Sequence, residues 1–195
     1  DDKFMKAVEA DDNYDLIDPN SNKVVKTVKA KELYDKIAYH AWKTGEPGML
    51  FVDTANKHNK IRHIGEFKAT NPCAEIWLLD YEVCNLGSIN LDRMIKTVNG
   101  QVTVDWDKIR KTTRLAINFL DNVIDAGEYP TPEIQIMAKK TRRIGLGVMG
   151  FADLLYQLGL PYSSKEGREI ATEIMRVIDE EGWAKSSDMA EERGA

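Results

Sequence analysis

Two short cysteine-containing segments carry the residue types that could do chemistry in this sequence. Residues 71–75 read Asn-Pro-Cys-Ala-Glu, and residues 84–91 read Cys-Asn-Leu-Gly-Ser-Ile-Asn-Leu. Alternate residues of an extended segment share a face, so Asn71, Cys73 and Glu75 are expected to point the same way. An amide, a sulfur and a carboxylate would then lie together, which suggests a functional site.

Other interpretations of the two cysteines remain open. A buried free cysteine in a loop is a common purely structural arrangement. A redox pair of Cys73 and Cys84 lacks the Cys-x-x-Cys spacing. A Cys-His nucleophile has no histidine nearby in sequence, although one could be near in space.

Length, charge and composition limit the classes of protein to consider. The chain has 195 residues, which suits one domain with a real core. Its net charge of −5 argues against non-specific nucleic-acid binding. Its 43% hydrophobic and 30% charged residues indicate a globular protein, without an apolar run that could span a membrane. Two cysteines and no signal peptide favour the reducing cytoplasm.

Both ends of the chain lie in helical patterns. The sequence starts at Asp1 without an initiator methionine and stops at Ala195 directly after a helical stretch. We therefore expect one partial domain over residues 1–195, cut from a longer protein at both ends.

Local patterns predict an α/β chain. Residues 23–28 are β-branched and roughly alternating, which predicts a strand. Residues 30–44 have helical spacing and stop at the Gly-Glu-Pro-Gly of residues 45–48. Residues 49–53 are expected to form a buried extended segment, and residues 55–67 a loop.

The C-terminal half is predicted to be rich in helices. Asn99 and Gly100 tolerate the positive φ of a tight hairpin turn. Asp105 can cap the next helix, and Pro132 suits the first position of another. Residues 163–166, Ser-Ser-Lys-Glu, match a capping box for the last helix.

Three further motifs have structural rather than functional interpretations. Residues 145–150 match G-x-G-x-x-G, but no buried strand precedes them, so close packing of glycines is favoured over dinucleotide binding. Residues 11–22 lack the glycine and glutamate that a calcium loop needs. His40, His58 and His63 lack zinc-type spacing and are expected to be solvated, so no metal site is predicted.

The two cysteine segments together resemble the catalytic subunit of ribonucleotide reductase. Proline between the asparagine and the cysteine, and the short link to the second cysteine, are similar to the adenosylcobalamin-dependent class II. The resemblance extends over the whole chain, and its other familiar stretches are residues 14–19, 42–48 and 144–154.

The resemblance implies a fold and a set of residue roles. The fold would be part of a ten-stranded α/β barrel with a central finger loop, whose tip carries Cys73. Cys73 would be the thiyl-radical residue that takes the 3′ hydrogen of a ribonucleotide. Glu75 would be the base on the 3′-hydroxyl, Asn71 would hydrogen-bond the substrate, and Cys84 would be one of two reducing cysteines.

The resemblance also implies a cofactor and partners. The cofactor would be adenosylcobalamin, the substrate a ribonucleoside diphosphate or triphosphate, and the reductant a dithiol such as thioredoxin. Nucleotide effectors would act on the parent protein, and a homodimer is compatible with the family. The activity would serve deoxyribonucleotide synthesis for DNA replication in the cytoplasm, without nucleic acid or membrane as partner.

Part of the machinery of that family has no counterpart in this chain. Cys73 and Cys84 are its only cysteines, so the partner of Cys84, the tail cysteines and the phosphate-binding loop are expected elsewhere. The isolated chain is expected to be inactive. Two alternatives remain, namely a thiol–disulfide redox protein that uses these cysteines and a non-catalytic helical interaction module.

Overall fold

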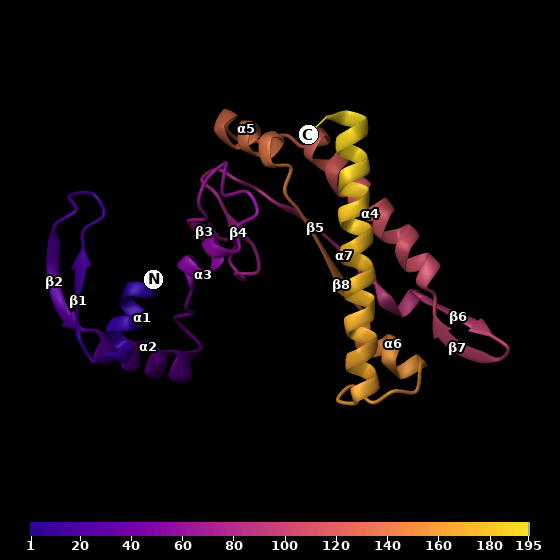
Figure 1. Ribbon diagram of the computed structural model, residues 1–195, viewed down its shortest axis with the longest axis horizontal. Coiled ribbons are helices and arrows are strands. Elements are labelled where there is room, and N and C mark those ends of the chain that lie inside the picture. The colour runs from indigo at the N-terminus through magenta and orange to yellow at the C-terminus, as the bar shows by residue number, and fades with distance from the viewer. Residues whose placement is uncertain (195) are drawn as a thin grey trace. The chain divides into compact units, whose positions relative to one another are not determined.

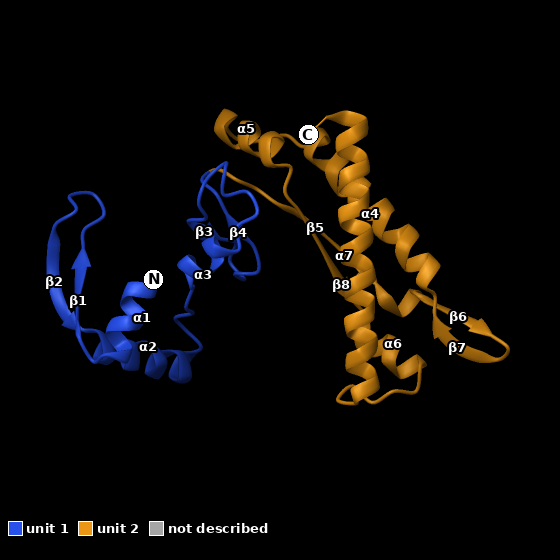
Figure 2. Cartoon of the chain, viewed as in Figure 1, with its two compact units in different colours: residues 1–80 blue, residues 81–195 orange. Residues whose placement is uncertain are grey.

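A computed structural model gives the structure of the chain and describes residues 1–194. The chain divides into two compact units, residues 1–80 and residues 81 onward (Figure 2). Both helices and strands occur, which confirms the expected mixture of α and β structure. None of the helices among the described residues is both long and apolar enough to cross a bilayer.

Unit 1 combines a helix pair with two hairpins (Figure 1). Strands β1 and β2 pair antiparallel, and helix α1 packs against helix α2. The elements in chain order are α1 (Asp2–Glu9), β1 (Asn13–Ile17), β2 (Val24–Lys29), α2 (Ala30–Thr44), α3 (Val52–Lys57), β3 (Ala69–Thr70) and β4 (Trp77–Leu78).

Unit 2 is built around two long helices that lie side by side, α4 and α7 (Figure 1). The elements in chain order are β5 (Asn85–Asn90), the 3₁₀ turn η1 (Leu91–Arg93), β6 (Ile95–Val98), β7 (Gln101–Val104), α4 (Trp106–Ala126), α5 (Pro132–Thr141), β8 (Ile144–Met149), α6 (Phe151–Gln157) and α7 (Lys165–Arg193).

The core of unit 2 joins elements that are distant in sequence. Ile89 of β5, Ile109 of α4 and Leu154 of α6 are buried together with Ile174 and Val177 of α7. Burying such aliphatic side chains is the main favourable contribution to folding. Helix α4 also packs against both β5 and β8, so this core holds the strand that follows Cys84.

The strands form four separate two-stranded sheets. Three of these sheets are antiparallel hairpins, and the fourth pairs β5 with β8 in parallel, starting at Asn85 opposite Ile144. No closed barrel exists within residues 1–194. The ten-stranded barrel and the single domain therefore stay predictions.

Several local predictions are confirmed. Helix α2 spans residues 30–44 and ends at Gly45, which has the left-handed φ of 84°. Asn99 and Gly100 have φ values of 52° and 79° and form the turn between β6 and β7. The side chain of Asp105 accepts the Lys108 N–H at the start of α4. His40, His58 and His63 are all exposed.

Three local predictions are wrong. Residues 49–53 are not a buried extended segment, because Phe51 is half exposed and Val52 is the first residue of helix α3. The same helix includes residues 55–57, which were predicted to belong to the loop 55–67. The cap of α7 is Ser164, whose hydroxyl accepts the Gly167 N–H. Ser163 and Ser164 are adjacent and either could cap the helix. The capping-box pattern assigned the cap to Ser163, one residue before the observed cap.

The glycine motif lies within and directly after strand β8. As expected, no separate strand precedes the motif, since helix α5 ends at Thr141; residues 144–149 form strand β8 themselves, and Gly150 then caps helix α6 with φ of 70°. A Cβ at Gly150 would lie 2.5 Å from Asn90 Oδ1, whereas one at Gly147 would come no closer than 3.7 Å to Ser88 Oγ. Close packing is therefore confirmed as the reason for the glycine at 150.

Gly150→Ala is expected to destabilise the chain by about 2 kcal/mol or more, because a left-handed φ and an overlapping Cβ both oppose alanine there. Gly147→Ala is the matched control, since its Cβ makes ordinary contacts. Urea unfolding of both variants measures the difference. Equal midpoints for the two variants would contradict the packing argument.

Candidate functional site

Asn71, Cys73 and Glu75 lie at the tip of the β3–β4 hairpin in unit 1. The Ala74 N–H donates to the Asn71 carbonyl at 3.0 Å, which closes a four-residue turn with Pro72 and Cys73 at its centre. Asparagine at the first position and proline at the second are both favoured in such turns. Ala74 then adopts φ of 65°, so the chain reverses directly after Cys73.

This geometry corrects the expectation that residues 71–75 are extended. A turn at residues 72 and 73 and a left-handed Ala74 break the two-residue alternation on which that argument depended. The three side chains share a loop tip instead of a strand face. Their proposed roles are not tested by the structure and stay predictions.

The side chain of Asn71 stabilises the loop itself. Its Oδ1 accepts the Ile76 N–H at 3.2 Å, and its own backbone N–H donates to the Ile76 carbonyl at 3.4 Å. Neither of these bonds uses its Nδ2 amide, which is a donor that Asn71 can offer to a ligand.

The base of the hairpin is anchored by residues that the sequence analysis did not single out. Asn56 of α3 makes two hydrogen bonds to the backbone of Phe67, as donor to its carbonyl at 3.0 Å and as acceptor from its N–H at 2.8 Å. Lys68 pairs with Asp80 across the hairpin, and this hydrogen bond raises the pKa of Lys68. The only sequence signal for this anchor was an asparagine in a polar segment.

Cys73 and Glu75 are exposed at the tip, whereas Cys84 is half-buried in unit 2. Both cysteines are free thiols. The structure therefore groups Asn71, Cys73 and Glu75 on one loop and places Cys84 at the entrance of strand β5, each within its own unit.

Cys84 lies between two anchors. Its Sγ is 3.5 Å from the Asn85 carbonyl, and the Asn85 side chain donates to the Leu120 carbonyl of α4 at 3.2 Å. On the other side, the Arg143 guanidinium donates to the Glu82 carboxylate at 2.8 Å. The Glu82 side chain is 0% exposed and that of Arg143 is 24% exposed, so this ion pair is largely shielded from water.

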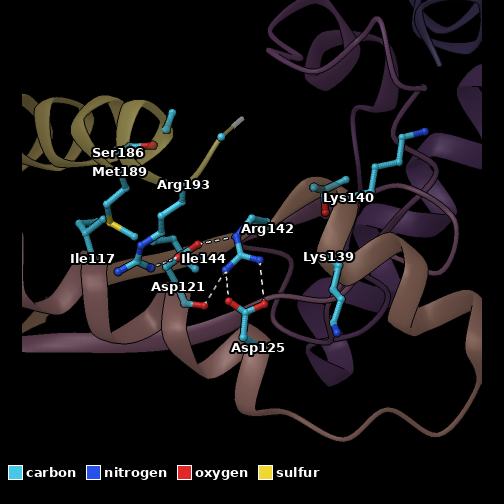
Figure 3. Close-up of a pocket in the computed structure, with 13 residues that line it drawn as sticks. Ile117, Asp121, Asp125, Lys139, Lys140, Arg142, Ile144, Ser186, Met189 and Arg193 are labelled. Carbon is cyan, nitrogen blue, oxygen red and sulfur yellow. Dashed lines mark hydrogen bonds and ion pairs between the residues drawn. The ribbon is translucent and has the colours of Figure 1, made fainter.

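A second arginine ties the same region to helix α4. Arg142 Nε pairs with Asp121 at 2.7 Å and its Nη2 pairs with Asp125 at 2.8 Å (Figure 3). The guanidinium lowers the pKa of Asp125 below its ordinary value, through a hydrogen bond first and charge second. Arg193 of α7 also pairs with Asp121, so the cluster joins α4, α7 and the C-terminal end of α5.

The cavity beside this cluster measures about 720 Å³ and is lined by both charged and apolar side chains. Figure 3 shows Arg142 turned toward the two aspartates, while Lys139 and Lys140 extend away from them. Within residues 1–194 no group of histidine, cysteine, aspartate and glutamate side chains is arranged to hold a metal ion.

Comparison with known proteins gives the class of this chain. The family model for the ribonucleotide reductase barrel domain matches residues 1–195, so the chain belongs to that family. The resemblance found in the sequence is thereby confirmed.

Curated relatives add the B12-dependent branch of the family. The chain is 45% identical over 193 residues to a vitamin B12-dependent ribonucleoside-diphosphate reductase of Thermoplasma acidophilum, covering 99% of the chain. It is 47% identical over 194 residues to the enzyme of the same name from Mycobacterium tuberculosis, covering all of the chain. The Chlamydia pneumoniae ribonucleoside-diphosphate reductase subunit alpha is 39% identical over 176 residues, 88% of the chain.

The chain spans only part of these relatives. It covers 25% of the Thermoplasma protein, 28% of the Mycobacterium protein and 16% of the Chlamydia protein.

Proposed function

We propose that this chain is part of the catalytic core of a vitamin B12-dependent ribonucleotide reductase. The observation that carries the proposal is the loop at residues 71–76, which holds a free Cys73 at an exposed tip, with Asn71 and Glu75 beside it in a chain of this family. Relatives named vitamin B12-dependent match 99–100% of the chain at 34–47% identity, which supports the cobalamin branch.

In the proposed reaction Cys73 acts as a thiyl radical on the ribose, and adenosylcobalamin, when bound, would supply the radical that takes the hydrogen atom from its thiol. The sulfur takes the hydrogen atom from the 3′ carbon, which leaves a thiol on Cys73 and a radical on the sugar. Glu75 accepts the proton of the 3′-hydroxyl, and this proton balances the one that the 2′-hydroxyl takes up to depart as water. The Nδ2 amide of Asn71 donates to a substrate oxygen, which is the hydrogen-bonding capacity that its contact with Ile76 leaves open.

Cys84 supplies reducing equivalents in the second half of the reaction. Its thiol and the thiol of a second cysteine, outside this chain, deliver two electrons and two protons to the sugar and become a disulfide. The hydrogen atom on Cys73 then returns to the 3′ carbon. An external dithiol of the thioredoxin kind reduces the disulfide for the next turnover.

For the fold of the full-length protein, we propose a ten-stranded α/β barrel with residues 71–76 as the tip of a central finger loop. The parallel β5–β8 pair supports it, because each strand has a free edge within residues 1–194 to which further strands can add. A radical at Cys73, exposed here, needs the shielding from water that such a barrel would give.

The two cavities of about 720 and 400 Å³ do not have the lining expected of a site for the corrin cofactor. Large cofactors bind in cavities lined mainly by apolar and aromatic side chains. The larger cavity is lined by the Arg142 ion-pair cluster, and the smaller one, about 400 Å³, is lined mostly by charged and polar residues near α1. Adenosylcobalamin is therefore proposed to bind to parts of the protein outside this chain.

The remaining partners follow from the proposed class. A ribonucleoside diphosphate is the favoured substrate, since the B12-dependent relatives from Thermoplasma and Mycobacterium are named for it. Nucleotide effectors, a homodimer and a cytoplasmic location stay proposals for the full-length protein.

The test is reduction of ribonucleoside diphosphates by the full-length protein that contains this chain. Deoxyribonucleotide formation is expected only when adenosylcobalamin and a dithiol are both present. Turnover without cobalamin, or none under any of these conditions, would overturn the proposal.

Glu75→Gln in that protein is expected to lower kcat by about 10²–10⁴-fold, the usual contribution of a positioned general base. The amide is nearly isosteric with the carboxylate but cannot accept the 3′-hydroxyl proton. Glu66→Gln is the matched control, because Glu66 is another exposed carboxylate of unit 1. An unchanged kcat in Glu75→Gln would exclude Glu75 as the base.

A further inference from the structure

The hairpin that carries Cys73 is short and depends on its base for its direction. Strands β3 and β4 contribute two residue pairs, Ala69 with Leu78 and Thr70 with Trp77. A ladder of this length fixes the two strands to each other. Where the tip lies within unit 1 is determined by the contacts at the base.

Two kinds of contact hold the base of the hairpin. Phe67 and Leu79, which flank the two strands, are 8% and 6% exposed. Apolar burial of this kind is non-directional, whereas a hydrogen bond depends on angle as well as on distance. The burial therefore keeps the base in place without fixing the angle at which the hairpin leaves it.

Asn56 of helix α3 supplies a directional contact. Its Nδ2 donates to the Phe67 carbonyl at 3.0 Å, and its Oδ1 accepts the Phe67 N–H at 2.8 Å. One side-chain amide thus bonds both polar groups of one residue, as the facing residue of a neighbouring antiparallel strand would. Two bonds to the same residue restrict its rotation about either bond.

A series of hydrogen bonds continues from this contact to the turn. The Lys68 N–H donates to the Leu78 carbonyl at 3.1 Å, and the Asn71 N–H donates to the Ile76 carbonyl at 3.4 Å. The Ala74 N–H closes the turn on the Asn71 carbonyl at 3.0 Å. A tilt at the base is therefore expected to carry the tip with it as one piece.

The length of the hairpin amplifies such a tilt. Phe67 and Asn71 are separated by about 13 Å at the usual rise of a strand, so a tilt of about 10° displaces the tip by about 2 Å. A misplacement of about 1 Å at a reacting centre can cost about 10²-fold in rate. The angle of the hairpin therefore matters more to a reaction at Cys73 than to the stability of the chain.

We propose that Asn56 is a positioning residue for the radical loop. Its amide fixes the angle of the β3–β4 hairpin and through it the place of the Cys73 sulfur against the ribose. An amide suits this task because it offers a donor and an acceptor in one planar group. The inference rests on the proposed radical role of Cys73.

Asn59 provides a matched control in the same unit. Its side chain donates to the Gly65 carbonyl at 2.9 Å and accepts the Ile61 N–H at 2.9 Å. The residue type and the number of bonds equal those of Asn56. These bonds close the loop that precedes the hairpin and do not reach either strand.

The first test measures kcat and KM for ribonucleoside diphosphate reduction by the full-length protein with adenosylcobalamin and a dithiol. Asn56→Ala is expected to lower kcat by about 10²-fold and to leave KM within about threefold of the wild type. Asn59→Ala is expected to keep both constants within about threefold of the wild type. A loss of kcat in Asn56→Ala no larger than that in Asn59→Ala would overturn the proposal.

Hydrogen exchange separates positioning from loss of structure. Asn56→Ala is expected to speed exchange of the Phe67 N–H, which loses its acceptor. Exchange of the Ala74 and Ile76 N–H groups is expected to stay at the wild-type rate, since their bonds lie within the loop itself. Faster exchange at all three would mean that the hairpin unfolds, and a purely structural role would replace positioning.

Asn56→Asp tests the hydrogen bonds directly through pH. An ionised carboxylate keeps the acceptor and loses the donor, whereas the protonated form has both. The ratio of its kcat to that of the wild type is therefore expected to rise by about threefold or more as the pH falls from about 8 to about 5.5. The nearby charged residues Asp53, Lys57, Glu66 and Lys68 are common to both proteins, so their titration cancels in the ratio. A ratio that is constant with pH would overturn the assignment.

Failure of the proposed function gives a different result from failure of this inference. Absence of turnover in the wild type, or wild-type turnover in Cys73→Ser, would refute the radical role. The exchange measurements need no turnover, and an unchanged Phe67 exchange rate in Asn56→Ala would refute the contact at the base of the hairpin.

Discussion

Cys73→Ser in the full-length protein is expected to abolish deoxyribonucleotide formation and leave nucleotide binding nearly unchanged. A hydroxyl fits the space of the thiol at the exposed turn, so the loop should keep its conformation. The hydrogen bonds that close the turn come from Asn71, Ala74 and Ile76 and do not involve the cysteine side chain. Because an O–H bond is much stronger than an S–H bond, an oxygen radical is not formed and the first hydrogen transfer fails.

The measurement is product formation together with nucleotide affinity by equilibrium binding. Lys68→Gln is the control on the same hairpin, since it removes an exposed ion pair at the base and leaves the tip unchanged. Such exposed pairs contribute little to stability. Measurable turnover in Cys73→Ser, with a serine at position 73 verified in the protein used, would show that another group carries the radical.

Local elements were predictable because near neighbours in sequence determine them. The Asn99-Gly100 turn and the Asp105 cap each depend on a few adjacent residues, and the helix that ends at Gly45 depends on a repeat within one segment. The family could also be predicted from the sequence, because the segments at residues 71–75 and 84–91 are specific to it. The match of the family model to the whole chain confirms that prediction.

The conformation of the 71–75 segment was missed for a different reason. Alternation of side chains holds only where the backbone is extended, and Pro72 at the second turn position favours the reversal that the structure has. Strand β8 was not predicted because its glycines interrupt the pattern of side chains that is typical of a strand. In the structure the segment is a strand because it pairs with β5.

Long-range pairs had no local signal at all. Neither the Asn56 bonds to Phe67 nor the Glu82–Arg143 pair can be derived from spacing, since the latter joins residues 61 positions apart. A glutamate two residues before a cysteine is unremarkable until its burial is known. The environment of Cys84 was therefore the part of the site that only the structure could give.

Cys84→Ser is expected to eliminate deoxyribonucleotide formation by a different failure from that of Cys73→Ser. The thiyl radical at Cys73 can still take the 3′ hydrogen, and the 2′-hydroxyl can still leave as water. No disulfide can then form, because serine cannot supply the electrons that the sugar needs. The oxidised sugar is expected to leave the site and lose its nucleobase by elimination.

The decisive measurement follows two products from a ribonucleotide labelled with tritium at the 3′ carbon. Cys84→Ser is expected to release both free nucleobase and tritiated water, since the Cys73 thiol exchanges its hydrogen with solvent. Cys73→Ser is expected to release neither. Ser88→Ala is the control on the strand that follows Cys84, because Ser88 is exposed and should not alter either product. Base release from Cys73→Ser and none from Cys84→Ser would mean that the roles of the two sulfurs are the reverse of those proposed here.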